Sequence, residues 1–235
     1  KIGSRVTQIH DIKDESKIDP KLDILDLSKK ADLSPVRCLN KSVEEKMIKI
    51  IDNAKKSGDS VGGIFEIFAT GLPYGLGSYT QWDLKLQARI TALIMSVNAY
   101  KGIEIGGGMK GVEKYGSEIH DEIGLKENHF IRHSNNAGGI EGGMSNGQPI
   151  ILKVAMKPIP TLIKPLKSID IMTKEEKLAH KERTDSCAVP AASIIAESML
   201  ALSLADALLE KFGGDSIQQL NDHLKASGKY WILYT

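Results

Sequence analysis

The sequence predicts a mixed fold in which strands and apolar helices form one domain. Three runs have the β-branched and aromatic content of strands, namely 2–12, 61–72 and 149–155. Two helical stretches, 81–100 and 188–212, are apolar on nearly every side, which indicates burial on most of their surface. Because no linker-like break separates these segments, we expect a single domain over residues 1–235.

The stretch 188–212 is long enough to cross a bilayer, but its acidic residues argue against a membrane span. Glu197 and Asp206 both lie inside it, and one acid near the centre of a spanning helix costs about 2.5 to 3.5 kcal/mol. We therefore expect a core helix that ends at Gly213-Gly214. After it, Asp215-Ser216 should cap a short amphipathic helix.

A surface helix is predicted to begin near Ser42. Ser42 and Glu45 have the spacing of a capping box, and Gly58 is a stop signal. One face carries apolar residues at helical spacing: Val43, Met47, Ile50, Ile51 and Ala54. Four other stretches are expected to be peripheral loops, mobile segments or a packed tail: 13–40, 113–129, 172–181 and 230–234.

Charge and cysteine content exclude several classes of partner. The chain has 31 basic and 30 acidic residues, so no overall field would recruit nucleic acid or an anionic membrane. Its two cysteines are too few for a disulfide framework and suit a reducing, cytoplasmic compartment. No signal peptide is visible, and the chain starts at Lys1 in a strand-like stretch, so we expect it to be the remainder of a longer protein.

The loop from Arg132 to Gln148 is the most unusual stretch. Five glycines and three asparagines favour turns and positive φ over regular structure. Two interpretations stay open from composition alone, a ligand-cradling loop and a glycine-rich turn or linker. Because Phe130-Ile131 precede it and the strand 149–155 follows, we expect a loop held between two buried strands. His133 within it could donate to a phosphate, although a hydrogen-bonded loop histidine is the commoner finding.

Common nucleotide and metal motifs do not fit. Gly106, Gly108 and Gly111 match G-x-G-x-x-G, but neither an apolar helix nor a ribose-binding acid follows them. No G-x-x-x-x-G-K-[ST] sequence occurs, which excludes a P-loop. The spacing of His120 and His129 matches no zinc motif, so no metal site is predicted.

Asp185 is the most suggestive ionisable residue. It lies two positions after Arg183, so in an extended segment the two side chains share a face. The helix predicted after it adds a positive partial charge, and both effects favour a carboxylate able to act as a base. A structural Arg-Asp pair or a helix cap explains the same residues equally well. Cys187 is more readily a small buried filler than a nucleophile, since no histidine is near it in sequence.

Taken together, these stretches resemble chorismate synthase, and they occur in the order found in that family over essentially the whole chain. The motifs are Gly58-Asp59-Ser60-Val61-Gly62-Gly63, the turn from Gly75 to Asp83, Ser96-Val97-Asn98-Ala99-Tyr100-Lys101-Gly102, the loop Arg132–Gln148, Lys157-Pro158, Arg183-Thr184-Asp185-Ser186-Cys187 and the helix to Gly213-Gly214. The loop combined with Arg-Thr-Asp-x-Cys is a specific signal.

The resemblance implies an α+β fold, a β-α-β sandwich with long buried helices between antiparallel sheets, assembled as a homotetramer. It implies a carbon-oxygen lyase acting on phosphates, in the shikimate pathway of aromatic amino acid biosynthesis. The reaction would be a 1,4-anti elimination of phosphate from 5-enolpyruvylshikimate-3-phosphate to give chorismate. The implied cofactor is reduced FMN, regenerated rather than consumed, with NADPH or a separate reductase needed to reduce it.

The resemblance also implies roles for particular residues. The cofactor-binding residues would be Asn98, Ala99, Gly142, Lys157, Pro158, Ile159, Pro160, Thr161 and Arg183. Asp185 would be catalytic and act on the flavin N5 proton. Gly142 is expected where a side chain would collide with the cofactor.

The chain departs from the family pattern in two ways. The Gly-Glu-Ser-His-Gly segment, an arginine-rich segment and a second catalytic histidine followed by a serine-containing flavin contact do not occur here. None of the six histidines takes those roles, which predicts the C-terminal portion of a chorismate synthase. Pro160 stands where a small hydroxyl residue is often found.

Two alternatives from other classes are retained. One is a flavin- or phosphate-binding fragment that is inactive because it lacks the catalytic histidines. The other is a structural fragment held by partner chains, for which the apolar tail is the hint.

Overall fold

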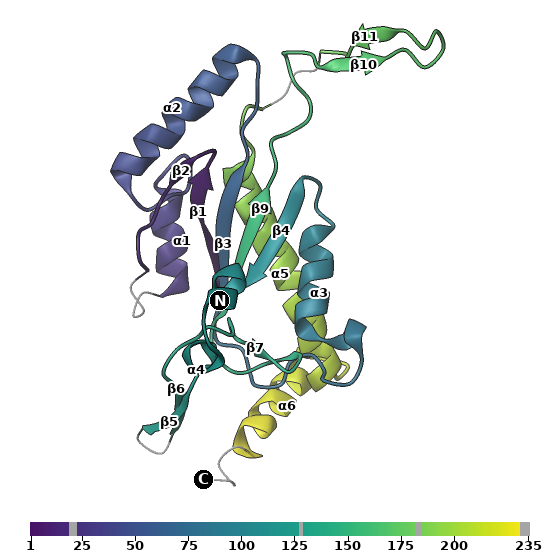
Figure 1. Cartoon of the computed structure of the whole chain (residues 1–235). Helices are drawn as coiled ribbons and strands as arrows, with labels where there is room; N and C mark the ends of the chain where they lie inside the picture. The colour runs from purple at the N-terminus through teal and green to yellow at the C-terminus, as the bar shows by residue number, and fades with distance from the viewer. Residues whose placement is uncertain (19–22, 127–128, 182–184, 231–235) are drawn as a thin grey trace.

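A five-stranded antiparallel sheet forms the centre of the protein (Figure 1). The computed structural model describes residues 1–18, 23–126, 129–181 and 185–230. The strand order is β2-β1-β3-β9-β4, and the strands are β1 (Ile2–Ile9), β2 (Ile12–Lys13), β3 (Gly63–Ala69), β4 (Tyr100–Ile105) and β9 (Ile150–Met156). Two of the predicted strands, at 61–72 and 149–155, are thus confirmed. The run 2–12 turns back at His10, whose φ is 53°, so it forms two strands.

Alternation along the strands separates the two faces of the sheet. Phe65 and Ile67 on β3 are fully buried in the main core, together with Leu152 and Val154 on β9. Phe68 points to the opposite face and joins a smaller apolar cluster. The two faces therefore carry separate cores, as the two-residue period of a strand requires.

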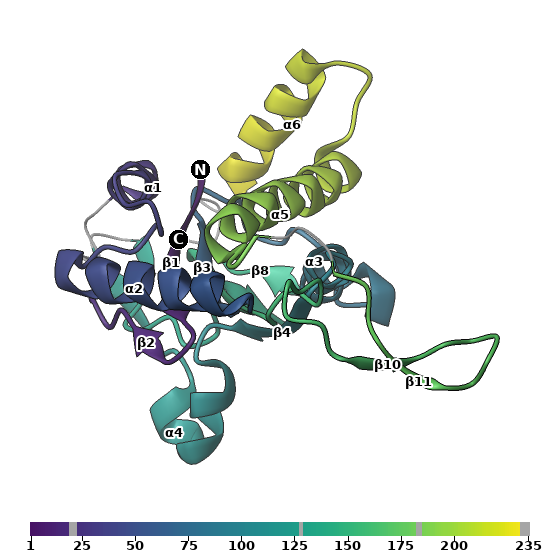
Figure 2. The same ribbon diagram turned by 90° about the horizontal axis from the view of Figure 1, so that it is seen from above.

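Two helices cover the main-core face. α3 (Leu86–Met95) packs against β4, and α5 (Val189–Phe212) packs against β1, β3 and α3. Figure 2, seen from above, shows α5 across the sheet and α6 (Ile217–Tyr230) folded back beside it. The predicted α+β class is confirmed, and in this chain the large sheet lies on one side of α5.

The two predicted apolar helices differ from the prediction, one in its length and the other in its burial. The predicted helix 81–100 starts with a short 3-10 turn, η1 (Trp82–Leu84), and its α-helical part ends at Met95, because residues from Tyr100 onward already form β4. α5 buries one face and exposes four large apolar side chains: Ile194, Ile195, Leu202 and Leu209. Burial on most sides was therefore wrong for α5 in this chain, whereas α3 has only one exposed residue, Ala92.

α5 has the length and composition of a membrane span, but its acidic residue near the middle has partners inside the fold. Glu197 accepts hydrogen bonds from the Ser4 hydroxyl at 2.6 Å and from Arg37 at 3.3 Å. Arg37 also donates to the Ser4 carbonyl. These contacts tie the helix to the sheet and support the predicted core helix. Gly213 ends it, as predicted.

The segment predicted to be peripheral, 13–40, contains a helix and buried polar residues. α1 (Ile24–Asp32) is capped by Asp23, whose carboxylate accepts the Leu25 N–H. α1 packs beside β1, with Ile24 and Leu27 in the smaller cluster. Sequence patterning missed this helix because its charged residues outnumber the apolar positions that define its inner face.

α2 (Lys41–Ser57) confirms the predicted surface helix but begins differently. The cap is Asn40, whose side-chain oxygen accepts the N–H groups of Ser42 and Val43. The predicted capping box at Ser42 was therefore wrong. The helix ends at Gly58 in the left-handed conformation, φ 70°, as predicted.

Shorter elements occupy the stretches predicted to be loops. Residues 106–132 contain η2 (Gly108–Glu113), α4 (Gly116–Ile119), β5 (Ile123–Lys126) and β6 (His129–Arg132). β7 (Ile140–Glu141) and β8 (Met144–Ser145) form a small hairpin. β10 (Lys167–Ile169) pairs with β11 (Glu176–Leu178), and this hairpin stands away from the body in Figure 1. The apolar tail lies mostly outside the described residues.

Candidate functional site

Three of the predicted binding segments meet at the end of the sheet where β9 stops. The Lys157 N–H donates to the Ala99 carbonyl at 2.9 Å, which joins Asn98-Ala99 to Lys157–Thr161. Beside them, the Val61 N–H donates to the Ser186 carbonyl at 2.8 Å, which places the segment of Asp185 next to the same strand end. Chain segments far apart in sequence, such as those of Val61 and Ser186, thus converge at one place.

Ala99 has an unusual backbone at this convergence. Its φ is 72°, a left-handed conformation that costs a non-glycine residue roughly 1–2 kcal/mol. Hydrogen bonds on both sides hold it: Tyr100 donates its N–H to Val97, and Lys157 donates to Ala99 itself. The neighbouring Asn98 is exposed. Such a held, strained turn presenting an amide side chain is common at ligand sites.

Tyr100 fixes this turn to the main helix. Its hydroxyl donates to the Ala192 carbonyl of α5 at 2.5 Å, and its ring meets Phe65 edge-on at 5.5 Å. Burial raises the pKa of Tyr100 to about 12, so the phenol keeps its proton and stays a donor. The site is therefore anchored to both sheet and helix.

The segment from Lys157 to Thr161 offers a cation and a hydroxyl on a stiff backbone. Pro158 and Pro160 fix φ and lack an N–H. Lys157, Pro158 and Pro160 are exposed, while Ile159 and Thr161 are half-buried. An exposed lysine beside a constrained backbone suits an anionic group such as a phosphate.

Asp185 is exposed and precedes the first helical residue, Val189, by four positions. Arg183 lies outside the described residues, so the predicted Arg183-Asp185 pair stays a prediction. The backbone of Cys187 forms an isolated parallel β-bridge with Val61, and its side chain packs on the main core. Burial raises the pKa of its thiol above the usual value, which matches the expected filler role.

The loop Arg132–Gln148 is held by many hydrogen bonds, as expected. Asp121 accepts N–H bonds from Asn136 and Ala137, at 2.7 and 2.9 Å. Although burial raises the pKa of Asp121, hydrogen bonds from Ser134, Ala137 and Asn136 outweigh it, and the net pKa is lowered. The prediction that buried strands flank the loop on both sides was wrong. Phe130 before the loop is 62% exposed, and it lies in the hairpin β5–β6.

Gly142 lies away from the other predicted residues. Its loop precedes Ile150 at one end of β9, whereas Lys157 follows Met156 at the other, about 20 Å away along a seven-residue strand. Gly142 has φ 59°, and a Cβ built there would meet nothing within 4 Å. Within the chain there is thus open space at this position.

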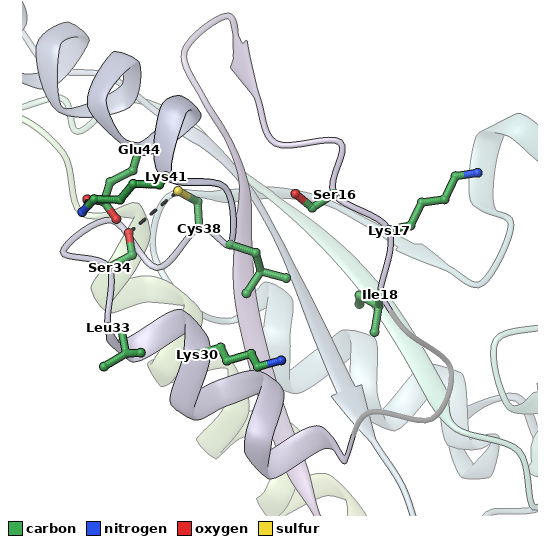
Figure 3. Close-up of a pocket in the computed structure, with 10 residues that line it drawn as sticks. Ser16, Lys17, Ile18, Lys30, Leu33, Ser34, Cys38, Lys41 and Glu44 are labelled. Carbon is green, nitrogen blue, oxygen red and sulfur yellow. Dashed lines mark hydrogen bonds and ion pairs between the residues drawn. The ribbon is translucent and has the colours of Figure 1, made fainter.

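The cavity drawn in Figure 3 lies elsewhere, between α1 and the start of α2. It measures about 520 Å³ and is lined by Ser16, Lys17, Ile18, Lys30, Leu33, Ser34, Cys38, Leu39, Lys41 and Glu44. Burial raises the pKa of Cys38. The lining contains none of the predicted site residues. Among the residues the structure describes, no three His, Cys, Asp or Glu side chains gather as a metal site.

Fold and site together define an α+β protein in which three predicted binding segments meet at one end of an antiparallel sheet. A family model described as chorismate synthase matches residues 1–209. Chorismate synthase 2 of Bacillus cereus is 54% identical over 198 residues, which are 84% of this chain and 51% of that protein. Chorismate synthase 1 of Bacillus thuringiensis is 51% identical over 208 residues, or 88% and 53% of the two chains.

A solved structure titled Crystal Structure of Chorismate Synthase superposes with a TM-score of 0.82 at 40% identity, covering 98% of this chain and 63% of that one. The chain belongs to the chorismate synthase family. It spans about half the length of the curated relatives it matches.

Proposed function

We propose that this chain forms the FMN-binding part of a chorismate synthase, a carbon-oxygen lyase that eliminates phosphate from 5-enolpyruvylshikimate-3-phosphate. Family membership supports the activity. The observation that supports the site is the convergence of Asn98-Ala99, Lys157–Thr161 and the Asp185 segment, which the resemblance implies as site residues. Lys157 donates its N–H to Ala99, and Ser186 accepts the N–H of Val61 beside the same strand end. A cytoplasmic location fits two free cysteines.

The residues present suit a phosphorylated flavin. Lys157 would pair with an anionic oxygen, Thr161 would offer a hydroxyl, and the Asn98 amide can both donate and accept at a flat polar ring. Reduced FMN, when bound, would supply electron density for cleavage of the C–O bond. The Asp185 carboxylate would hold or accept a proton beside it. Arg183 belongs to the same proposal by its place in sequence.

In this proposal, Gly142 contacts the flavin of another copy of the chain. Because it lies at the far end of β9 with open space around it, it would approach a flavin held by a neighbouring subunit. A homotetramer, which the family resemblance implies, would supply such a neighbour.

Turnover tests the activity in a protein of the relatives' length that contains this chain. We expect chorismate and phosphate to form from 5-enolpyruvylshikimate-3-phosphate only when FMN is reduced, by NADPH or by a separate reductase. Equal turnover with oxidised FMN in air would contradict the mechanism. FMN binding without turnover by both this chain and the longer protein would favour a non-catalytic binding role.

Replacing Asp185 tests the proton role. Asp185→Asn should slow turnover by about 10²- to 10⁴-fold, the range for a general acid or base, and leave the FMN dissociation constant nearly unchanged. Asp52→Asn, an exposed aspartate on α2, is the control and should behave as wild type. An unchanged rate in Asp185→Asn would remove Asp185 from the mechanism.

A further inference from the structure

The six residues Gly58 to Gly63 run from the cap of α2 to the first residue of β3 and contact two of the three segments of the candidate site. The Gly58 carbonyl accepts the Lys164 N–H at 2.9 Å, and the Val61 N–H donates to the Ser186 carbonyl at 2.8 Å. At Gly62 the backbones are so close that an added Cβ would lie 2.3 Å from the Met156 carbonyl oxygen. This short strip, 58–63, is therefore the surface on which the site segments rest.

The lysine-proline segment has few backbone donors with which to hold itself. Pro158, Pro160 and Pro165 lack an N–H. Lys157 donates to Ala99 and Lys164 donates to Gly58, one at each end. Between them, the Ser60 hydroxyl donates to the Ile159 carbonyl at 2.7 Å. Ser60 thus holds the middle of the segment.

Ser60 is itself held rigidly. It is 7% exposed, its N–H is bound by the Asp59 carboxylate at 2.9 Å, and the Asp59 N–H donates to Ala54 in the last turn of α2. Because its backbone is held to the end of α2, the Ser60 hydroxyl has a defined position and can fix the position of the Ile159 carbonyl. Preorganising a binding segment in this way lowers the ordering cost of ligand binding.

We propose that Ser60 is a positioning residue for the candidate site. Its hydroxyl fixes Ile159 and thereby places Lys157 and Thr161 on either side for an anionic cofactor. The identity of that cofactor as FMN rests on the proposed function. The hydrogen bond by which Ser60 fixes the segment 157–164 does not.

The experiment compares Ser60→Ala, Ser60→Thr and Ser34→Ala in the full chain. Ser34 is a matched control because it is a buried serine, 6% exposed, in the α1–α2 connection. FMN binding is followed by flavin fluorescence, and the exchange of backbone amides over 157–164 is followed without ligand. Thermal unfolding shows which variants are folded.

We expect Ser60→Ala to weaken FMN binding by about five- to tenfold, the effect of one hydrogen bond, and to speed exchange over 157–164. Ser60→Thr, which keeps the hydroxyl, should restore both, and Ser34→Ala should change neither. A folded Ser60→Ala with wild-type affinity and wild-type exchange would overturn the inference. If wild type binds no FMN, the proposed function fails, and the exchange result alone decides the role of Ser60.

Discussion

At the scale of single residues, two glycines near the same sheet end differ sharply in the space around them. A Cβ at Gly62 would lie 2.3 Å from a backbone oxygen, whereas at Gly102 the nearest atom is the Ala155 Cβ at 3.8 Å. Gly62→Ala should therefore cost about 1–3 kcal/mol in unfolding free energy through overpacking. Gly102→Ala should stay within about 0.5 kcal/mol of wild type. Chemical denaturation of both variants measures this, and equal stabilities would contradict the packing described.

A second residue-scale prediction concerns acid stability. The Asp14 carboxylate accepts N–H bonds from Ser16, Leu39 and Asn40. Burial raises its pKa, but these hydrogen bonds outweigh burial, and the folded pKa lies below the usual 3.8. Its stabilisation is therefore present above the unfolded pKa and is lost as pH falls through the folded value.

Asp14→Asn should lower the unfolding free energy at pH 7 by about 1–2 kcal/mol, because one set of buried donors loses its acceptor. The difference from wild type should shrink below about pH 4. Urea unfolding between pH 3 and pH 7 measures it, with Asp52→Asn as control. A difference that is constant with pH would show that the charge is not responsible.

The segments of the candidate site were recognisable in the sequence, whereas the contacts that support them are apparent only in the structure. Asn98, Lys157 and Asp185 carry motifs recognisable in sequence, and their segments meet. Ser60, Gly62 and Tyr100 also belong to motifs that carry the resemblance, but their structural roles could not be predicted, because these depend on carbonyls of residues about 90 or more positions away. Long-range partners of this kind are not encoded in any local spacing.

At the scale of elements, two residues could cap the start of α2, Asn40 in the structure and Ser42 by sequence spacing. Asn40 accepts the N–H groups of Ser42 and Val43, so Asn40→Ala should cost about 1 kcal/mol. Ser42→Ala removes the residue that sequence spacing favoured and should cost less than about 0.5 kcal/mol. Thermal unfolding of the two variants is the measurement. The reverse order of stabilities would restore the capping box.

The strongly patterned elements were predictable, and the short ones were not. β3, β9, α2 and α5 have long periodic apolar stripes and appear close to their expected bounds. α1 and the hairpins β5–β6 and β10–β11 are short and have only two to four apolar positions each among polar and charged residues. Their structure follows from local turns, such as Asp170 accepting N–H bonds at the tip of β10–β11.

At the scale of the whole molecule, Glu197 links the long helix to the sheet and to the α1–α2 connection. Glu197→Ala would leave Arg37 and the Ser4 hydroxyl without this acceptor, and should cost about 1–3 kcal/mol. Glu197→Gln keeps an oxygen and should cost less. Guanidinium unfolding distinguishes them. A stable Glu197→Ala protein would show that the network does not hold α5 in place.

The exposed apolar face of α5 also belongs to this scale. Composition predicted that the helix is apolar all round, but which side meets the sheet is set by packing. Likewise, sequence order could not reveal that Gly142 and Lys157 lie at opposite ends of β9. That separation is a property of the topology.

The central claim is that the end of the sheet beyond β9 binds FMN. A crystal structure of the chain with FMN tests it most directly. We predict flavin against Asn98 and Lys157, with its phosphate within hydrogen-bonding distance of a lysine or hydroxyl of 157–161. FMN seated instead in the cavity between α1 and α2, with no density beside Lys157, would contradict the account.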